Sequence, residues 1–553
     1  MRAPIPPFVL LMLMLVLPAS GVMITGFCPD TYAMDEPDEF IVLSGNGSLA
    51  GISITDGEGS IRFPDGASIA GRAVVARQAE GYLRVHGTLP DYEMMPTHPD
   101  VPDMIRSGDL RMANTQDSLN LLEDGVTVQE VAWPGMVAAR QGQVHFLEDG
   151  AWDPHPRLIG QSDFAPETFE NVSLTLFVSP DCSYEVVEAA IHSARYHINA
   201  NLYEFTHPGI ARMLAGALDR GVGLTILLEG GPVGGVPLEE RAVARTLSGG
   251  GAAVMAMGTV GENHARYRFD HAKYMVIDNE SVLLTTENFK ESGIPECGRA
   301  GNRGWGVWVR DPAVAAYFNG VFRADSMGGD ITPMAGGGEM VPADAVCRHP
   351  CFAPLTVEGA RVTPVLSPET SALVLDLISG AEESIWIEQA YISNSTDGQP
   401  NRFLAAAIEA ARRGVDVRVL LDSAWFNTAD EEDNDEQAAW INALARAESL
   451  PLQARCADLE AAGLDKVHTK GVIVDNRSVL VSSMNWNDNS ADFNREAGVI
   501  VDSTEAGRYF AGVFSADWES SSDAGEEIDV RLICAAAILA IFLAAAVIRR
   551  RRS

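Results

Sequence analysis

Apolar and polar residues alternate in short runs over the first part of the chain. Runs such as EFIVLSGNG, GSIRFPDGASIAG and VTVQEVAWPG follow the two-residue period of strands and are separated by Gly, Asp and Pro. Successive side chains of a strand point to opposite faces, so each run presents one apolar and one polar face. The pattern predicts a small all-β, Ig-like sandwich over residues 38–140.

From about residue 165 the apolar runs alternate with Ala-rich amphipathic stretches, which favours an α/β architecture. This part of the chain also repeats itself. LAGALDRGVGLTILLEGG matches LAAAIEAARRGVDVRVLLDSA, FDHAKYMVIDNESVLLTTENF matches KVHTKGVIVDNRSVLVSSMNW, and NRGWGVWV matches NREAGVIV. One unit therefore occurs twice, and we assign its copies to residues 165–335 and 345–525.

Both ends of the chain are strongly apolar. The run Phe8–Leu17 follows Arg2 and precedes small residues, so we interpret residues 1–24 as a signal peptide or an uncleaved signal anchor. Residues 532–548 lack charge and adjoin four arginines, which predicts one transmembrane helix rather than a buried C-terminal helix. The predicted location is the cell membrane, with the body outside and the basic tail in the cytoplasm.

Charge and cysteine content change this picture only slightly. The chain carries 76 acidic and 40 basic residues, a formal net charge of −36, which repels nucleic acid and anionic lipid unless bases gather locally. Six of the seven cysteines lie outside the predicted span. An exported body permits disulfides, but their pairing cannot be derived from spacing. No carboxylate cluster with metal-ligand spacing accompanies the motifs described next, so we expect neither metal nor cofactor.

The pattern HxKxxxxD occurs once in each copy, as His271, Lys273 and Asp278 and as His468, Lys470 and Asp475. Each occurrence opens an alternating apolar run and is predicted to lie on a strand. His and Lys, two residues apart, then face a ligand together, whereas Asp points the other way and braces the strand from behind. Asn288 and Asn485 follow the two histidines at the same distance. Chance does not readily produce the same spacing twice.

These motifs resemble the signature of the phospholipase D superfamily, and the resemblance covers roughly residues 165–520. It implies two similar α/β sandwich halves that pack face to face around one shared active site. Thr285-Thr286 and Ser482-Ser483 depart from the family's Gly/Ser element. The segments EFIVLSG and LRMANTQDSLNLLEDG of the β-sandwich resemble a lamin-tail domain, which implies a role in positioning or tethering.

The resemblance implies a phosphodiesterase whose chemistry follows from these side chains. Two lysine charges and two asparagine amides would stabilise the anionic phosphoryl group in the transition state. One neutral imidazole would attack phosphorus to form a phosphohistidine, and the other, protonated, would release the leaving alcohol and then activate water. These roles require the pKa values of the two histidines to differ. The resemblance favours His271 as nucleophile and His468 as acid/base.

The two copies differ in one residue that bears on this chemistry. Glu496 stands where the family places a carboxylate that orients an imidazole, and the sequence assigns it to His468 of the same copy. The matching position of the first copy is Gly304. His271 is therefore expected to lack that partner unless Glu291, Glu296 or another acid replaces it.

Three functions are compatible with the sequence. The preferred one is a membrane-anchored phosphodiesterase acting on phospholipid head groups by hydrolysis or phosphatidyl transfer. The alternatives are an extracellular nuclease of the same superfamily and a non-catalytic surface adhesion or scaffold protein. The acidic charge and the lack of a basic, aromatic-rich stripe argue against the nuclease. The intact His, Lys and Asn of both copies argue against the scaffold.

Overall fold

The computed structural model describes residues 21–133, 141–155, 157–261, 263–296, 298–339, 352–395, 398–428 and 433–521. They form two compact units. The first unit combines the chain up to Gln161 with two later segments, residues 259–266 and 327–331, and the second unit comprises the rest. The predicted span at 532–548 and most of the predicted leader lie outside the described residues. Within the described ranges, no helix is long and apolar enough to cross a membrane.

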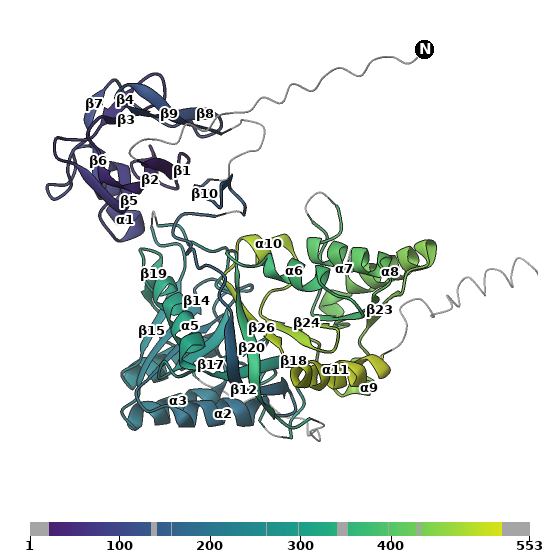
Figure 1. Ribbon diagram of the computed structural model, residues 1–553. Coiled ribbons are helices and arrows are strands. Elements are labelled where there is room, and N and C mark those ends of the chain that lie inside the picture. Colours follow the sequence, from purple (N-terminus) through teal and green to yellow (C-terminus); the bar gives the residue numbers. More distant parts are fainter. Residues whose placement is uncertain are drawn as a thin grey trace, which may run out of the picture. The chain divides into compact units, whose positions relative to one another are not determined.

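The first unit contains two mainly antiparallel sheets that share one apolar core (purple and blue in Figure 1). Ile41 and Leu43 of one sheet and Ile54 and Leu121 of the other are fully buried in it. The first strand begins at Met23, within the predicted leader, so the sheets extend beyond the predicted 38–140 at both ends. One sheet contains β1 (Met23–Cys28), β2 (Phe40–Ser48), β5 (Ser68–Gln78), β6 (Tyr92–Met95), β10 (His145–Glu148) and β11 (Ala151–Trp152), and the other contains β3 (Ile52–Thr55), β4 (Ser60–Arg62), β7 (Ile105–Ser107), β8 (Asp117–Glu123) and β9 (Val126–Trp133), with α1 (Ala79–His86) beside them.

A single 15-stranded sheet runs through the second unit, in the order β19-β15-β14-β13-β16-β17-β18-β12-β20-β26-β25-β24-β21-β22-β23. Its first half contains β12 (Phe169–Ser179), α2 (Ser183–Ser193), β13 (His197–Leu202), α3 (Pro208–Asp219), β14 (Gly223–Glu229), α4 (Leu238–Gly249), β15 (Ala253–Met257), β16 (Lys273–Ile277), β17 (Ser281–Thr285), β18 (Gly304–Arg310), α5 (Pro312–Asp325) and β19 (Ile331–Pro333).

The second half repeats this element order. It contains β20 (Leu355–Ser367), α6 (Leu373–Ser379), β21 (Ser384–Gln389), α7 (Arg402–Arg412), β22 (Asp416–Leu421), a 3-10 turn (Trp425–Asn427), α8 (Asn434–Glu448), β23 (Leu452–Cys456), α9 (Leu459–Ala462), β24 (Lys470–Val474), β25 (Ser478–Ser482), α10 (Asp488–Asp492), β26 (Glu496–Asp502) and α11 (Thr504–Glu519). The predicted duplicated α/β architecture is confirmed.

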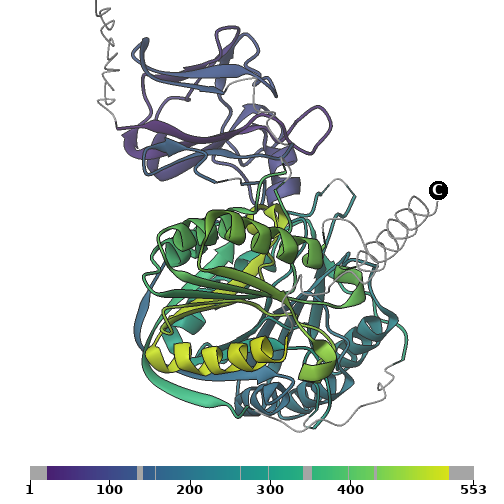
Figure 2. The same cartoon turned by 90° about the vertical axis from the view of Figure 1, so that its right-hand side faces the viewer.

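Helices cover both faces of each half. In the second half α6, α7 and α8 lie on one face of the sheet and α11 lies on the other, as Figure 2 shows. Because strands β16, β17 and β24 are covered on both sides, nearly all their residues are buried, which explains their continuous apolar runs. Polar side chains start the covering helices: Asp311 caps α5 and Ser503 caps α11.

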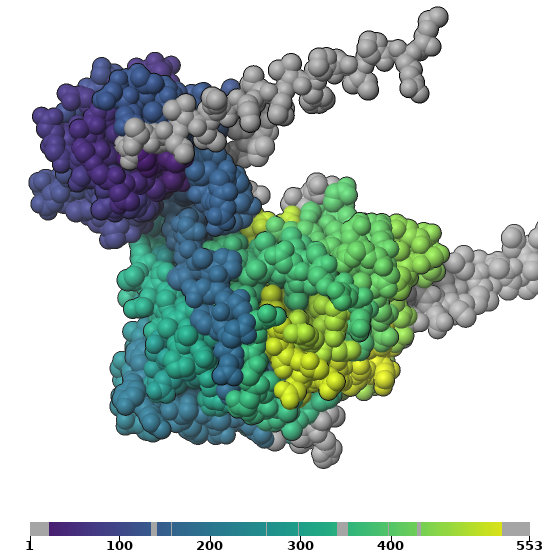
Figure 3. Space-filling model, in the orientation of Figure 1, coloured from purple at the N-terminus to yellow at the C-terminus, as the bar shows by residue number. Residues whose placement is uncertain are grey.

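The two halves join at the antiparallel pair β12–β20, where Leu174 lies opposite Val357. The sheet also folds back, so that β16, β17 and β18 contact β24, β25 and β26. The halves therefore share an edge and also pack face to face, and they form one continuous body in Figure 3, from the blue and teal region to the green and yellow one.

Two buried arginines at matching positions form ion pairs across this junction. Arg303 of the first half pairs with Asp517 of the second at 2.6 Å and with Asp181 at 2.7 Å. Arg495 of the second half pairs with Asp325 of the first at 2.8 Å and with Glu369 at 2.8 Å. Charges this deeply buried are tolerated only when they are paired, so the four carboxylates fix how the halves meet.

Candidate active site

Backbone hydrogen bonds connect each motif histidine to the opposite half. The His271 N–H donates to the carbonyl oxygen of Arg495 at 2.8 Å, and the His468 N–H donates to that of Arg303 at 2.8 Å. Strands β16 and β24 begin only at the lysines, so the prediction that the histidines lie on strands is wrong by two residues. The reason is that the histidine N–H groups bond to the opposite half instead of a neighbouring strand of their own.

These hydrogen bonds between the halves determine which carboxylate lies beside which imidazole. Nδ1 of His271 lies 2.8 Å from Oε2 and 3.0 Å from Oε1 of Glu496. Glu496 is itself held by the Asn494 amide at 3.0 Å and the Ser483 hydroxyl at 2.6 Å. The expectation that Glu496 orients His468 is therefore wrong: it serves the histidine of the other copy, because Arg495, its neighbour, binds the His271 backbone.

A glutamate that the sequence pattern did not single out faces the second histidine. Oε1 of Glu287 lies 3.4 Å from Nδ1 of His468. Oε2 of Glu287 accepts a hydrogen bond from the Asn302 amide at 2.9 Å. Glu287 directly precedes the predicted Asn288, and its side chain is buried. Both histidines thus have a carboxylate at Nδ1, one from β26 and one from the loop after β17.

The two motif lysines are buried beside the histidines. Nζ of Lys273 donates to the His271 carbonyl oxygen at 2.7 Å, and Nζ of Lys470 donates to that of His468 at 2.6 Å. Burial lowers the pKa of Lys273 to about 8, against the opposing charge of Glu496. Burial also moves the pKa of Lys470 well below its ordinary value, and the nearby charge of Lys273 adds to this. The two lysines therefore act on each other within one site.

The histidines are neutral at pH 7 in the free protein. Burial lowers the pKa of His271 to about 4, although the charge of Glu496 opposes the shift. Burial and the charges of Lys466 and Lys470 move the pKa of His468 well below its ordinary value. A bound phosphodiester would bring negative charge beside both rings and raise both pKa values.

The motif asparagines lie ready to bind a ligand. Oδ1 of Asn288 and Oδ1 of Asn485 are buried and have no hydrogen-bond partner among the described residues. Buried amide oxygens are nearly always satisfied, so these two oxygens are open to a hydrogen-bond donor of a group that enters the site.

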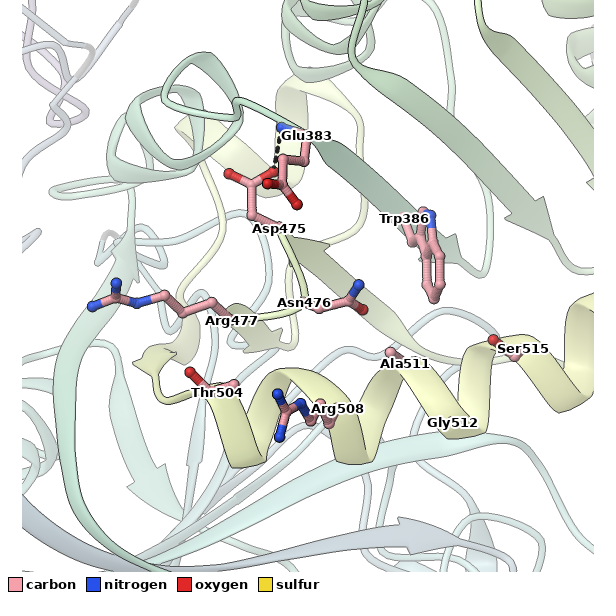
Figure 4. Close-up of a pocket in the computed structure, with 10 residues that line it drawn as sticks. All are labelled: Glu383, Trp386, Asp475, Asn476, Arg477, Thr504, Arg508, Ala511, Gly512 and Ser515. Carbon is pink, nitrogen blue, oxygen red and sulfur yellow. Dashed lines mark hydrogen bonds between the residues drawn. The ribbon is translucent and has the colours of Figure 1, made fainter.

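The motif aspartates lie at the opposite ends of strands β16 and β24. Asp278 accepts three backbone N–H bonds at 2.8 Å, from Arg195, Tyr196 and His197. Asp475 likewise accepts from three consecutive residues, among them Glu383 at 2.7 Å (Figure 4). They thus tie each motif strand to the start of its neighbour. Both side chains are half-buried rather than fully buried. A separate pocket of about 480 Å³ lies at this end of β24, between its turn and α11 (Figure 4).

Replacing Asp278 by Ala is expected to lower the free energy of unfolding by about 2 kcal/mol, because three backbone N–H groups lose their acceptor. The midpoint of urea unfolding measures the change. Glu280→Ala alters an exposed acid of the same turn and is expected to change the free energy by less than about 0.5 kcal/mol. Equal losses in the two variants would contradict the bracing role.

A pocket of about 350 Å³ opens beside His271. Its lining is mostly neutral and polar, and it includes Tyr203 from the first half and Tyr391 from the second. Tyr203 packs edge-on against His271, with ring centroids 4.6 Å apart, and Tyr391 accepts a hydrogen bond from Asn487 at 3.1 Å. The remaining lining residues are Val233, Phe269, Ser393, Asn394, Asn485, Asp488, Asn489, Ser490 and Asn494.

Three further basic side chains, two of them histidines, have structural roles. His207 caps α3 through Nδ1 and lies 2.9 Å from the Ile294 carbonyl through Nε2. His264 stacks on Tyr32. Arg266 pairs with Asp330. Among the described residues, no group of three or more His, Cys, Asp or Glu side chains could hold a metal ion. Three described cysteines carry free thiols: Cys28, Cys182 and Cys456.

Two segments of the chain match a known protein family. The family described as "Cardiolipin synthase, PLD-like domain" matches residues 187–326 and again residues 374–518, together just over half of the chain. A comparison with curated proteins finds no match.

Solved structures that resemble the chain include three enzymes of known source. Phosphatidylserine synthase from Haemophilus influenzae Rd KW20 is 12% identical, with a TM-score of 0.48, over 68% of this chain and 96% of that one. Nuc, a phospholipase D family member from Salmonella typhimurium, is 27% identical, with a TM-score of 0.24, over 30% and 97%. Polyphosphate kinase from Porphyromonas gingivalis is 13% identical, with a TM-score of 0.38, over 63% and 50%.

The family match falls separately on the two halves and includes both HxKxxxxD motifs. The structure brings the two motifs together, each histidine facing a carboxylate of the opposite half. On this evidence the chain belongs to the phospholipase D superfamily and is a phosphodiesterase.

Proposed function

We propose that this chain is a membrane-anchored, outward-facing phosphodiesterase that acts on phospholipid head groups, by hydrolysis or by phosphatidyl transfer. In this proposal it works through a phosphohistidine and without a metal ion. The observation that carries the choice of substrate is the pocket beside His271. Apart from that histidine, its lining residues are neutral except for Asp488.

The proposed reaction has two steps. Nδ1 of His271 is engaged by Glu496, so the lone pair of Nε2 is available to attack phosphorus. The bond from phosphorus to the leaving oxygen breaks, and His468, protonated once the bound phosphodiester has raised its pKa, donates a proton to that oxygen. Water, or an acceptor alcohol, then attacks phosphorus and gives its proton to His468, and the phosphorus–nitrogen bond breaks. Lys273, Lys470 and the two motif asparagines stabilise the phosphoryl oxygens.

A nuclease of the same superfamily is the alternative. Proteins that bind nucleic acid strands combine a basic groove that follows the backbone with stacked aromatic side chains. The pocket has Tyr203, Phe269 and Tyr391 but no Lys or Arg among its lining residues. The net charge of −36 also opposes the approach of a polyanion. These observations favour a short head group over a long nucleic acid strand.

Presenting two substrates to the full-length protein tests the proposal. The protein is reconstituted in vesicles of phosphatidylglycerol and phosphatidylcholine with a chelator present, and plasmid DNA is offered in a parallel reaction. We expect head-group release, or transfer to added ethanol, without release of nucleotides. Nucleotide release with intact lipid would support the nuclease instead. Turnover that disappears in chelator and returns with a divalent cation would overturn the metal-free mechanism.

The lowered pKa of His271 predicts an unusual pH profile. The imidazole of His271 stays neutral, and so available as the nucleophile, down to about pH 4. We therefore expect the acid limb of the kcat/KM profile to lie near that pH. The charge of Glu496 raises the pKa of His271, so Glu496→Gln should move the acid limb to still lower pH and reduce the rate. An acid limb near pH 6.5 in the wild-type enzyme would contradict this assignment.

A further inference from the structure

The two copies differ in a complementary way at two positions. In the second copy Glu496 begins strand β26, and Met484 stands in the loop before Asn485. In the first copy the equivalent strand position is Gly304, and the equivalent loop position is Glu287. Each copy therefore has one glutamate and one uncharged residue at these positions, in exchanged places.

Both glutamates reach equivalent surroundings from these different starting points. The Asn302 amide donates to Glu287 at 2.9 Å, and the equivalent Asn494 amide donates to Glu496 at 3.0 Å. Each carboxylate also faces Nδ1 of the histidine from the opposite half. The two carboxyl groups thus have equivalent contacts, although they come from different positions in the two copies.

Gly304 makes room for this replacement. A Cβ atom at position 304 would lie 2.4 Å from Cγ and 2.5 Å from Oε1 of Glu287, closer than any side chain tolerates. The φ angle of Gly304 is not in the left-handed region, so the backbone alone does not require glycine there. The side chain of Glu287 fills the space in which a residue at 304 would stand.

Two buried atoms are left without any other partner. Nδ1 of His468 and Oε1 of Glu287 have no hydrogen bond within the described part of the chain, and they lie 3.4 Å apart. A buried donor or acceptor that stays unsatisfied is unfavourable, so a small rotation of the ring that brings the two together is favoured. Hydrogen bonds of catalytic groups are often long before substrate binds.

We propose that Glu287 is the positioning residue that orients His468 and stabilises its protonated form, in the place that Gly304 vacates. The carboxylate holds the Nδ1–H tautomer and turns Nε2 toward the leaving oxygen. The catalytic consequence rests on the proposed acid/base role of His468, but the orientation of the ring can be tested without it. Burial raises the pKa of Glu287 to about 7, so the carboxyl group can share a proton with the imidazole near neutral pH.

The test exchanges the two positions so that the first copy imitates the second. The variants are Glu287→Met, Gly304→Glu and the double substitution, made in the full-length protein. Two measurements are made on each: kcat for a chromogenic phosphodiester, and the ¹⁵N chemical shifts of the His468 ring without substrate. Glu280→Met, in an exposed turn, is the matched control.

We expect Glu287→Met to lower kcat by about 100-fold, as loss of a group that orients a catalytic side chain does. Gly304→Glu alone should be at least as damaging, because its side chain collides with Glu287. The double variant should recover kcat to within about tenfold of wild type, since the carboxylate introduced by Gly304→Glu would then occupy the place that Glu496 occupies in the second copy. The control should match wild type.

The inference would be overturned by an unchanged kcat in Glu287→Met, or by a folded double variant no more active than the single ones. If Glu287→Met does not fold, the isosteric Glu287→Gln is measured in the same way. If wild type cleaves no phosphodiester, the proposed function fails, whereas the ¹⁵N shifts still decide the inference. A change of the His468 tautomer in Glu287→Met, absent from the control, would support it, and identical spectra would refute it.

Discussion

Replacing His271 by Ala is expected to lower kcat at least about 1,000-fold and to prevent any phosphoenzyme from forming. The imidazole is neutral, Nδ1 is fixed by two contacts with Glu496, and Nε2 is left for attack on phosphorus. Rapid quenching in acid-free conditions with a ³²P-labelled substrate measures the phosphoenzyme, and steady-state turnover measures kcat.

His192→Ala is the matched control, because it makes the same chemical change on the exposed face of α2. It should leave both measurements at the wild-type level. A phosphoenzyme that persists in His271→Ala and disappears only in His468→Ala would reverse the roles of the two histidines. Loss of kcat in both, with the phosphoenzyme accumulating in His468→Ala, would support the roles proposed above.

The largest effect on stability is expected from the junction of the two halves. Replacing Arg495 by Met leaves the carboxylates of Asp325 and Glu369 buried without their cation, and breaking a buried ion pair in this way costs about 3–5 kcal/mol. Because the backbone of Arg495 also anchors His271, turnover should fall as well. Urea unfolding followed by tryptophan fluorescence measures the midpoint.

Arg361→Met is the control for this prediction. Arg361 pairs with Asp502 on an exposed surface, where the side chain of the arginine is 48% exposed, and such a pair contributes less than about 1 kcal/mol. A loss of stability in Arg495→Met no greater than in Arg361→Met would show that the buried network does not hold the halves together.

The repeated spacing in the sequence was sufficient to predict the α/β duplication and the two motifs. Strand β16 and strand β24 are short and buried on both faces, so their apolar runs are unambiguous, and the same distance to Asn288 and Asn485 fixes the register of both copies. These are local properties, and local properties are what a single sequence displays.

The pairing of carboxylates with histidines could not be predicted in this way. It depends on two parallel bridges between distant segments, Asp270 with Arg495 and Arg303 with Val467, which leave no periodic signal in the sequence. Assigning Glu496 to the histidine of its own copy followed chain order, whereas the structure exchanges the partners. The Asn-Arg dipeptide that precedes both Gly304 and Glu496 was the available signal, because each arginine anchors the opposite histidine.

The exchanged carboxylates have a consequence for how the two copies can change over time. Two identical subunits encoded by one gene must carry the same residue at both sides of a shared site, so every substitution occurs twice. Joining the copies through β12 and β20 in one chain gives each side its own codons. A glutamate can then move from a strand to a loop on one side while the other side keeps its arrangement, and the nucleophile and the proton donor can be adjusted separately.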